Sequence, residues 1–411
     1  MLLQGIAQRN ITCASIGRLV GVVFIAWILT QPAALAQGAG DEAVLDSHNV
    51  RLNDRAEYTA VTERVEQELS ERDKSPGPEH IATLSTANGL AAFYRAQGRF
   101  DEAEKLYQRV QAGFAKTLGP DAPSPLVSVV NLAMVYEARG RYSEAELLYK
   151  QALAGREEAL GPEDAFTLRH VNFLAGLYQA QERYREAELL YQRVLAGREK
   201  VLGPEHPLTL SSVNDLGSLY RAQRRYAEAA TLYQRARVGA ESALGTQHLV
   251  TLTSIINIGL LYQAKGQHSD AEQFLAAAMA GSTRAFGATH PDTLRCANNL
   301  ARLYQEQRRY GAAEALYLTT AAGFENAFGP EHPDTLKSVA DLGSLYHTQA
   351  RYSEAEPLLK RVLISREKTL ISEHPSTLKS VHDLATLYEA QGRHTEAELL
   401  LKQVPADLRS K

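Results

Sequence analysis

Six histidines recur at one fixed position of an internal repeat and are the residues best suited to chemistry. They are His80, His206, His248, His290, His332 and His374, and a glutamate precedes four of them. A carboxylate beside an imidazole is a pairing found in acid–base catalysis and in metal sites. However, equivalent residues of successive helical repeats lie about 10 Å apart, whereas a metal needs three or four ligands around one point. We therefore predict that these histidines shape the turn before a helix, and we predict neither a metal site nor a cofactor.

Paired glutamates also recur, two residues apart, at the start of predicted helices. They include Glu102 with Glu104, Glu144 with Glu146 and Glu186 with Glu188. Side chains at i and i+2 of a helix point in different directions, so these carboxylates are poorly placed to act as an acid and a base on one substrate. They are expected to complement the helix dipole instead. Because the sequence also has no glycine-rich phosphate loop and no Ser-His-Asp arrangement placed by a strand, we predict that the protein is not an enzyme.

Both sets of residues belong to an internal repeat of 42 residues without insertions. The eight blocks begin at Gly77, Gly119, Gly161, Gly203, Gly245, Gly287, Gly329 and Ile371. A fixed period of this length indicates one continuous stack of helical units, because each unit buries its apolar face only against its neighbours. The repeats account for residues 77–404.

Each block contains two helical patterns with their own boundary signals. The first helix is expected to begin at a proline, whose missing N–H is harmless at the first helical position; such prolines are Pro123, Pro207, Pro291, Pro333 and Pro375. It ends at a turn where four blocks have a glycine suited to a left-handed C-cap, namely Gly98, Gly140, Gly266 and Gly392. For the second helix, Ser143 and Glu146 predict a capping box, with Tyr142 and Leu147 as a hydrophobic staple. The same box is predicted at Asp101/Glu104, Ser269/Glu272, Ser353/Glu356 and Thr395/Glu398.

Two positions of the repeat hold only small residues. The first, on helix one, reads Ala91, Ala133, Ala175, Gly217, Gly259, Ala301, Gly343 and Ala385. The second, early in helix two, reads Ala103, Ala145, Ala187, Ala229, Ala271, Ala313, Ala355 and Ala397. Small residues let two helices approach to about 8 Å, so we predict that the helices of each block pack at these columns.

The repeat also resembles a known family. In the fourth block, Leu216, Gly217, Tyr220, Ala229 and Tyr233 form the pattern Leu-Gly/Ala-x-x-Tyr followed by Ala-x-x-x-Tyr. This pattern resembles the tetratricopeptide repeat, and the 42-residue length with the phrase GPEHPxTLxSVxxLAxLYxxQxRYxEAExLY resembles the repeats of kinesin light chains and their bacterial relatives. The resemblance implies an all-α solenoid, a right-handed superhelix of eight helix pairs. Two features depart from the family pattern: no block has the tryptophan of helix one, and the usual proline late in helix two is absent. The last block breaks at Pro405, so its second helix is expected to be short.

The resemblance further implies a concave groove, lined by the first helices, that binds extended peptides. A column that holds the peptide backbone in the family reads Asn88, Val130, Asn172, Asn214, Ile256, Asn298, Ala340 and His382 here. Positive charge on the same stripe is concentrated in blocks six to eight, which favours an acidic or carboxylate-bearing segment as the ligand; an ordinary solvated face is the alternative. The candidate peptide-binding residues are Asn88, Arg95, Arg169, Asn172, Asn214, Arg221, Arg295, Asn298, Arg302, Lys337, His347, Lys379 and His382.

Residues 1–36 have the pattern of a signal peptide. Two arginines precede the apolar run Leu19–Leu29, and Ala34 and Ala36 are the small residues that cleavage after Ala36 requires. The run has 11 residues, whereas a membrane-spanning helix needs about 20. An uncleaved membrane anchor is the alternative.

The remaining flanks are short. Residues 37–76 are predicted to form a flexible lead-in and then an amphipathic helix, with Tyr58, Val61 and Val65 on its apolar side, that caps the first repeat. Residues 405–411 form a short C-terminal tail.

Charge and cysteine content restrict the kind of partner. The net charge is −4. This argues against nucleic acid as the ligand, because nucleic-acid binding requires a positively charged surface. Cys13 lies in the leader, so Cys296 is the one thiol left for the array, and a disulfide framework or a cysteine metal cluster within one chain is excluded. We predict that Cys296 is buried in a helix; pairing between two chains is the alternative.

These observations favour a scaffold for protein–protein interaction, periplasmic or secreted, that binds extended peptide segments without catalysis. The expected partner is a protein or peptide, acidic in the basic half of the groove, and no membrane span is expected after cleavage of the leader. Two other classes stay open, a structural protein that assembles with its own copies and a regulatory subunit of a separately encoded enzyme.

Overall fold

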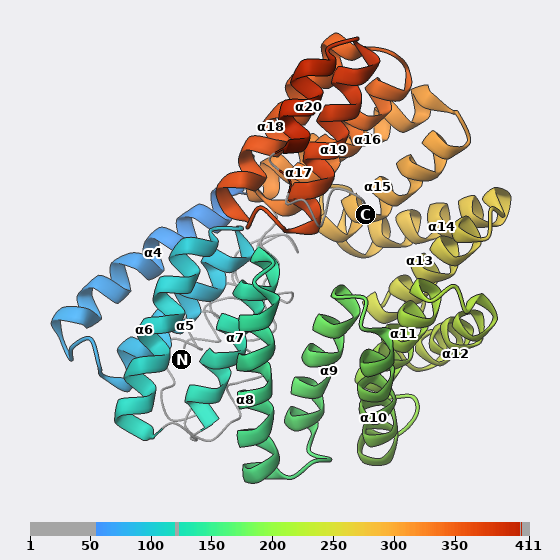
Figure 1. Ribbon diagram of the computed structural model, residues 1–411. Helices are drawn as coiled ribbons and strands as arrows, with labels where there is room; N and C mark the ends of the chain where they lie inside the picture. The colour runs from blue at the N-terminus through green and yellow to red at the C-terminus, as the bar shows by residue number, and fades with distance from the viewer. Residues whose placement is uncertain (1–54, 120–122, 403, 405–411) are drawn as a thin grey trace, which may run out of the picture. The chain divides into compact units, whose positions relative to one another are not determined.

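A computed structural model describes residues 55–119, 123–402 and 404, and Figure 1 shows that the described chain runs through consecutive packed helices. Within these residues all the regular structure is helical. The predicted signal peptide, the flexible lead-in before residue 55 and the C-terminal tail lie outside the described residues.

Each block of the repeat contributes one pair of helices, which confirms the predicted all-α solenoid of helix pairs. The first helices are α5 (Ile81–Ala96), α7 (Pro123–Arg139), α9 (Ala165–Ala180), α11 (Pro207–Ala222), α13 (Leu249–Ala264), α15 (Pro291–Glu306), α17 (Pro333–Thr348) and α19 (Pro375–Ala390). The second helices are α6 (Phe100–Leu118), α8 (Tyr142–Leu160), α10 (Tyr184–Leu202), α12 (Tyr226–Leu244), α14 (His268–Phe286), α16 (Tyr310–Phe328), α18 (Tyr352–Thr369) and α20 (His394–Lys402). From α8 onward each helix packs on the next one along the chain.

The repeated histidines lie directly before the first helices, as predicted, and they act as N-caps. The Nδ1 atom of His206 accepts a hydrogen bond from the backbone N–H of Leu208 at 3.2 Å. The same bond is made by His80, His248, His290, His332 and His374. In the third block Asp164 takes this role, with a bond of 2.9 Å to the N–H of Phe166. An imidazole nitrogen therefore replaces the usual carboxylate or hydroxyl cap.

The turn between the two helices has the left-handed conformation that the glycines predicted. Its φ lies between 73° and 84° at Gly98, Gly140, Gly266 and Gly392. The other described turns reach φ of 59° to 61° without glycine, at Glu182, Arg224, Arg308 and Ala350. A non-glycine residue in this region is strained by about 1 kcal/mol or more, so packing of the helix pair must stabilise these four turns.

The predicted capping box is wrong. Helix α8 begins at Tyr142, one residue before the expected cap, and its N-cap Arg141 makes no side-chain capping bond. Leu147 is 68% exposed, so it forms no staple with Tyr142. Helices α10, α12, α14, α16 and α18 begin in the same way. The motif gave a wrong prediction because its glutamate, which was expected to cap the helix, contacts the next repeat instead.

The two small-residue columns lie in the core. Ala229 is fully buried, and a Cβ atom added to Gly217 would lie 2.7 Å from the ring of Tyr233. Even a methyl group at Gly217 would have to push this ring away, so a side chain larger than alanine would overpack the column. Cys296 is buried as predicted, and its thiol lies 3.4 Å from the Oγ of Ser282.

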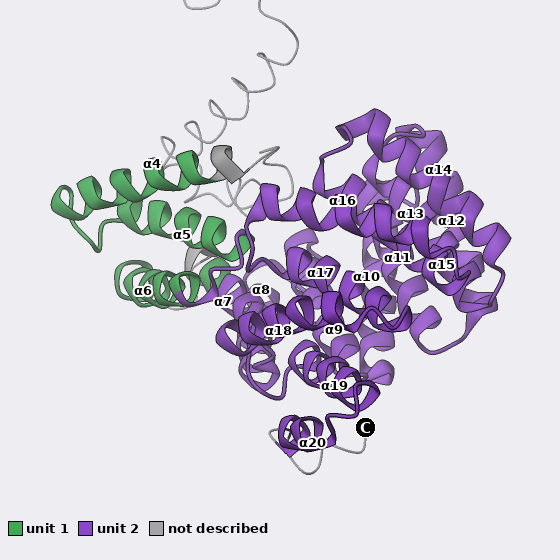
Figure 2. Cartoon of the chain, turned by 90° about the horizontal axis from the view of Figure 1, so that it is seen from above, with its two compact units in different colours: residues 1–96, 102–128 green, residues 97–101, 129–411 purple. Residues whose placement is uncertain are grey.

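The chain divides into two compact units, which Figure 2 shows in different colours. Unit 1 contains α4 (Arg55–Lys74), α5 and most of α6, and unit 2 contains the repeats from residue 129 onward. Helix α4 packs on α5, where the hydroxyl of Tyr94 donates to the Glu66 carboxylate at 2.6 Å. Among the described helices, none combines the length and the apolar character needed to cross a membrane.

Candidate functional site

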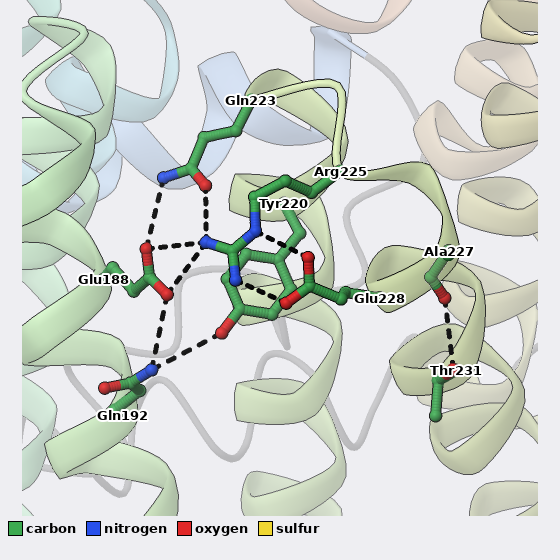
Figure 3. Close-up of polar contacts among 8 residues, drawn as sticks. All are labelled: Glu188, Gln192, Tyr220, Gln223, Arg225, Ala227, Glu228 and Thr231. Atoms are coloured by element: carbon green, nitrogen blue, oxygen red, sulfur yellow. Dashed lines mark hydrogen bonds and ion pairs between the residues drawn. The ribbon is translucent and has the colours of Figure 1, made fainter.

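Repeats are joined near their turns by a group of side chains centred on an arginine, shown in Figure 3 for Arg225. Its guanidinium lies 3.9 Å from the ring centroid of Tyr220. The same group donates to Glu188 of the preceding repeat at 2.8 and 2.9 Å, and to Glu228 at 2.7 Å. Burial alone would raise the pKa of Glu188, but the bonds from Arg225 hold it below its ordinary value. We call this arrangement the turn clamp.

The turn clamp recurs at most junctions of the array. The arginine–glutamate pairs between repeats are Arg183–Glu146, Arg225–Glu188, Arg309–Glu272, Arg351–Glu314 and Arg393–Glu356. At the junction of repeats four and five both partners are replaced, by Ala230 and Gln267. Two of the glutamate pairs that raised the question of catalysis thus contain a structural member, since Glu146 binds Arg183 and Glu188 binds Arg225 of the next repeat.

The asparagine column connects neighbouring first helices. Asn172 donates through Nδ2 to Asp215 at 3.2 Å, and Asn214 donates to the Oγ of Ser254 at 2.9 Å. Asn298 donates to Asp341 at 2.8 Å and accepts from Ser338 at 3.0 Å. We call these bonds the amide ladder. Asn88, Asn214 and Asn298 are buried, so in this structure their side chains face the protein interior.

Three of the basic candidates in repeats six to eight are paired with carboxylates. Arg295 donates to Asp292 at 2.8 Å and to Asp334 of the next repeat at 2.7 Å. Lys337 lies 3.7 Å from Asp341, and Lys379 lies 2.7 Å from Asp383. The site predicted from the sequence did not include these aspartates. They reduce the net positive charge that was predicted for this surface.

The other candidates lie on first helices of separate repeats. Arg169 lies 5.4 Å from the ring of Phe166, and His347 lies 6.0 Å from the ring of Tyr352. Arg95 and Arg221 lie close enough to Tyr107 and Tyr233 to act on the pKa of these phenols. His382 is exposed.

A pocket of about 760 Å³ is lined mainly by the first helices of repeats six to eight, with Ala138 of α7 and the end of α18 also on its wall. It brings together three of the predicted residues, Arg302, Lys337 and Lys379. Four carboxylates share its lining: Glu306, Glu331, Asp334 and Asp341. The pocket is therefore a mixed-charge site rather than a uniformly basic one.

A fourth cation of the pocket, Arg366 of α18, was missed by sequence reasoning. Its side chain is 8% exposed, and its Nη1 donates to the carbonyl of Ser376 at 2.9 Å and to the Oγ of Ser380 at 2.7 Å. Burial lowers its pKa, although Asp383 and Asp341 act in the opposite sense. The available signal was the recurrence of arginine at this position in Arg156 and Arg198, but it lies on the second helix, which was not expected to face the groove.

His374, the N-cap of α19, also lines the pocket. Burial, together with the nearby charge of Arg366, lowers its pKa to about 4. The imidazole is therefore neutral at pH 7, as its role as acceptor for the N–H of Ser376 requires.

Comparison with known proteins identifies the repeat. The sequence profile described as tetratricopeptide repeat matches residues 70–158, 164–242, 212–282, 249–326, 306–368 and 351–404. A search of curated proteins finds no match.

Several solved structures are similar to this chain. A kinesin light chain-like protein of Podosopora anserina with nearly identical TPR-like repeats is 32% identical, over 51% of this chain and 98% of that one, with a TM-score of 0.43. BtubC (BKLC) of P. vanneervenii is 19% identical over 57% of this chain and 89% of its own, with a TM-score of 0.43. The apo form of the quorum sensor NprR of B. thuringiensis is 16% identical over 75% of this chain and 82% of its own, with a TM-score of 0.51. With profile matches along nearly the whole array and one helix pair in every block, this chain belongs to the tetratricopeptide repeat family, whose fold is a scaffold for protein–protein interaction.

Proposed function

We propose that this chain is a non-catalytic scaffold that binds an extended segment of a partner protein along the first helices of repeats six to eight. The observation that carries the proposal is the pocket of about 760 Å³, because it joins side chains of α15, α17 and α19 into one concave surface. Concave, partly apolar sites with a few convergent polar groups are the usual form of ligand sites. The groove is long enough for several residues of an extended chain, since three helices about 10 Å apart span about six residues at 3.3 Å each.

The cations of the pocket favour a partner segment that carries negative charge. Lys337 and Lys379 are exposed and reach solvent beside their aspartate partners. Exposed ion pairs are weak, at about 0–1 kcal/mol, so a carboxylate of the partner can replace an aspartate at little cost. The carboxylates of the lining then set the register of the segment, because they repel acidic residues at the wrong positions.

We further propose that the protein works outside the cytoplasm. The support is the leader, in which Arg9 and Arg18 precede the apolar run Leu19–Leu29 and Ala34 and Ala36 follow it. Trp27 is the one tryptophan of the chain. Native protein purified from the producing cells should therefore show tyrosine fluorescence alone, whereas tryptophan emission contradicts cleavage after Ala36.

The binding proposal is tested by capture of partners from an extracytoplasmic fraction. The variant reverses charge at Arg302, Lys337 and Lys379, each changed to glutamate. The matched control reverses three cations that are exposed on second helices, Lys105, Arg185 and Arg284. We expect partners that are retained by the wild type and the control but lost from the pocket variant. Equal capture by all three proteins contradicts the proposal, and light scattering that shows assembly of the pure chain supports the structural alternative instead.

A further inference from the structure

We propose that Ala340 opens a subsite between repeats seven and eight that receives one carboxylate side chain of the partner, with Arg366 as its counter-charge. This inference rests on the proposed function, since it names the residue of the partner that the pocket recognises. It is carried by a comparison between two junctions of the same array.

The junction of repeats three and four contains the same side chains with one difference. Arg198 occupies the position of Arg366, and it donates in the same way to a carbonyl, at Leu208, and to a serine Oγ, at Ser212. Asp215 occupies the position of Asp383. At this junction Asn172 reaches from one first helix to the next and donates to Asp215. At the later junction Ala340 stands in the place of Asn172, and its methyl group lines the pocket.

The loss of this rung of the amide ladder leaves Asp383 to another partner. Asp383 is bound by Lys379 of its own helix at 2.7 Å. The second carboxylate near Arg366, Asp341, accepts from Asn298 of the preceding repeat at 2.8 Å. Both aspartates that act on Arg366 are therefore held by other groups.

Arg366 is consequently a buried cation that bonds to neutral oxygens. Its hydrogen bonds go to the Ser376 carbonyl and the Ser380 hydroxyl, and no carboxylate of the described chain forms an ion pair with it. A buried charge that lacks an opposite charge is costly. A guanidinium binds a carboxylate through two parallel hydrogen bonds and pairs well with it in a desolvated site. A ligand carboxylate in the pocket supplies the direct ion pair that Asp341 and Asp383 do not form with Arg366.

The rest of the lining defines the neighbours of that carboxylate. Leu336, Ala340 and Leu370 give the pocket apolar walls, and Arg302 on α15 is a further cation of the lining beside Lys337 and Lys379. The volume of about 760 Å³ admits more than one side chain. The recognised element is thus an aspartate or glutamate with apolar residues beside it, rather than a run of acidic residues, which the four lining carboxylates would repel.

The test uses two peptide probes that differ in one charge, acetyl-Leu-Glu-Leu amide and acetyl-Leu-Gln-Leu amide, titrated calorimetrically against the full chain at millimolar concentration. We expect the glutamate peptide to bind at least tenfold more tightly than the glutamine peptide. Equal binding of the two peptides, or no binding of either, overturns the proposal.

Four variants locate the effect. Ala340→Asn restores the missing rung and should remove the preference for glutamate, whereas Asn172→Ala opens the matched junction and should leave the preference unchanged. Arg366→Gln should lower affinity for the glutamate peptide at least tenfold, and Arg198→Gln, which removes the equivalent buried arginine, should leave it unchanged. A preference that survives Ala340→Asn in a folded protein, checked by circular dichroism, contradicts the subsite.

The same variants separate this proposal from the scaffold itself. If partners from the extracytoplasmic fraction bind the wild type, Ala340→Asn and Arg366→Gln equally, the chain is a scaffold but the subsite is wrong. If the wild type binds no partner and neither peptide, both proposals fail.

Discussion

Neighbouring repeats are joined in two places, and the two places differ in how strictly the chain repeats itself. Near the turns, the turn clamp of arginine, tyrosine and glutamate is nearly the same at each junction where it occurs. On the inner face, the amide ladder changes from junction to junction, with asparagine, valine, isoleucine, alanine and histidine at one position. A joint that repeats unchanged holds the stack together. A junction whose residues vary between repeats can differ in what it binds. The pocket lies at Ala340, where alanine replaces the asparagine of the amide ladder.

The largest effect is expected from the invariant core beneath the clamp. Ala229 is fully buried, whereas its neighbour Ala230 is exposed. Ala229→Leu should lower the free energy of unfolding by about 1–3 kcal/mol, because added methylene groups overpack a close helix contact. Ala230→Leu is the control and should change it by less than about 0.5 kcal/mol. Urea denaturation measures both, and equal stability of the two variants contradicts the helix contact at this column.

The amide ladder should respond according to the number of bonds in each rung. Asn298 is 3% exposed and bonds to Asp341, Ser338 and Thr320. Asn298→Ala should cost about 1–2 kcal/mol, since it leaves buried polar groups without partners. Asn172→Ala removes a bond to Asp215 and should cost roughly 0.5–1 kcal/mol. A larger loss for Asn172→Ala in urea denaturation would reverse the proposed order of the two rungs.

A smaller effect should appear in the pH dependence of the free energy of unfolding, through His374, the N-cap of α19. The pKa of His374 is about 4 in the folded protein, against about 6.5 for an unfolded histidine. Between these values the unfolded chain binds more protons, so the contribution of His374 is complete above pH 6.5 and is lost as the pH falls toward 4. With allowance for solvent screening, we expect a loss of about 1 kcal/mol.

His374→Asp provides the matched comparison for this pH effect. Asp164 already makes the same backbone bond in the third repeat, and an aspartate stays ionised at pH 5. The variant should lose less stability than the wild type between pH 7 and pH 4.5 in thermal unfolding. Parallel pH profiles for the two proteins contradict the assigned pKa.

How well the sequence predicts a structural feature of this protein depends on how far apart in the chain the interacting residues lie. The helix pairs, the prolines and the left-handed turns follow from local rules that act within a few residues, and these predictions are confirmed. The capping box failed because Glu146 binds Arg183, which lies 37 residues away in the next repeat. The carboxylate partners of the basic candidate residues were missed for the same reason, since Arg295 and Asp334 lie 39 residues apart.

The buried arginine shows a second limit of the sequence. Arg366 belongs to a second helix, and a charged residue near the end of such a helix is typical of a solvated position. Only packing of α19 against α18 places its guanidinium beside the inner face. A column of variable residues therefore indicated where the chain differs, at Ala340, but not which side chain from the neighbouring helix fills the space.

The smallest effect should come from rebuilding the turn clamp at the junction of repeats four and five, where Ala230 and Gln267 replace its two charged members. Ala230→Glu and Gln267→Arg together should raise the midpoint of thermal unfolding, because the new arginine can stack on Tyr262 and bond to the new glutamate as Arg225 does with Tyr220 and Glu188. Each single variant should give little gain, so that a double-mutant cycle reports a favourable interaction. This interaction should weaken at 1 M salt, where the screening length falls to about 3 Å. If the two single effects are additive, apolar packing between α12 and α13 already fixes this junction. The turn clamp would then form as a consequence of that packing and would not stabilise it.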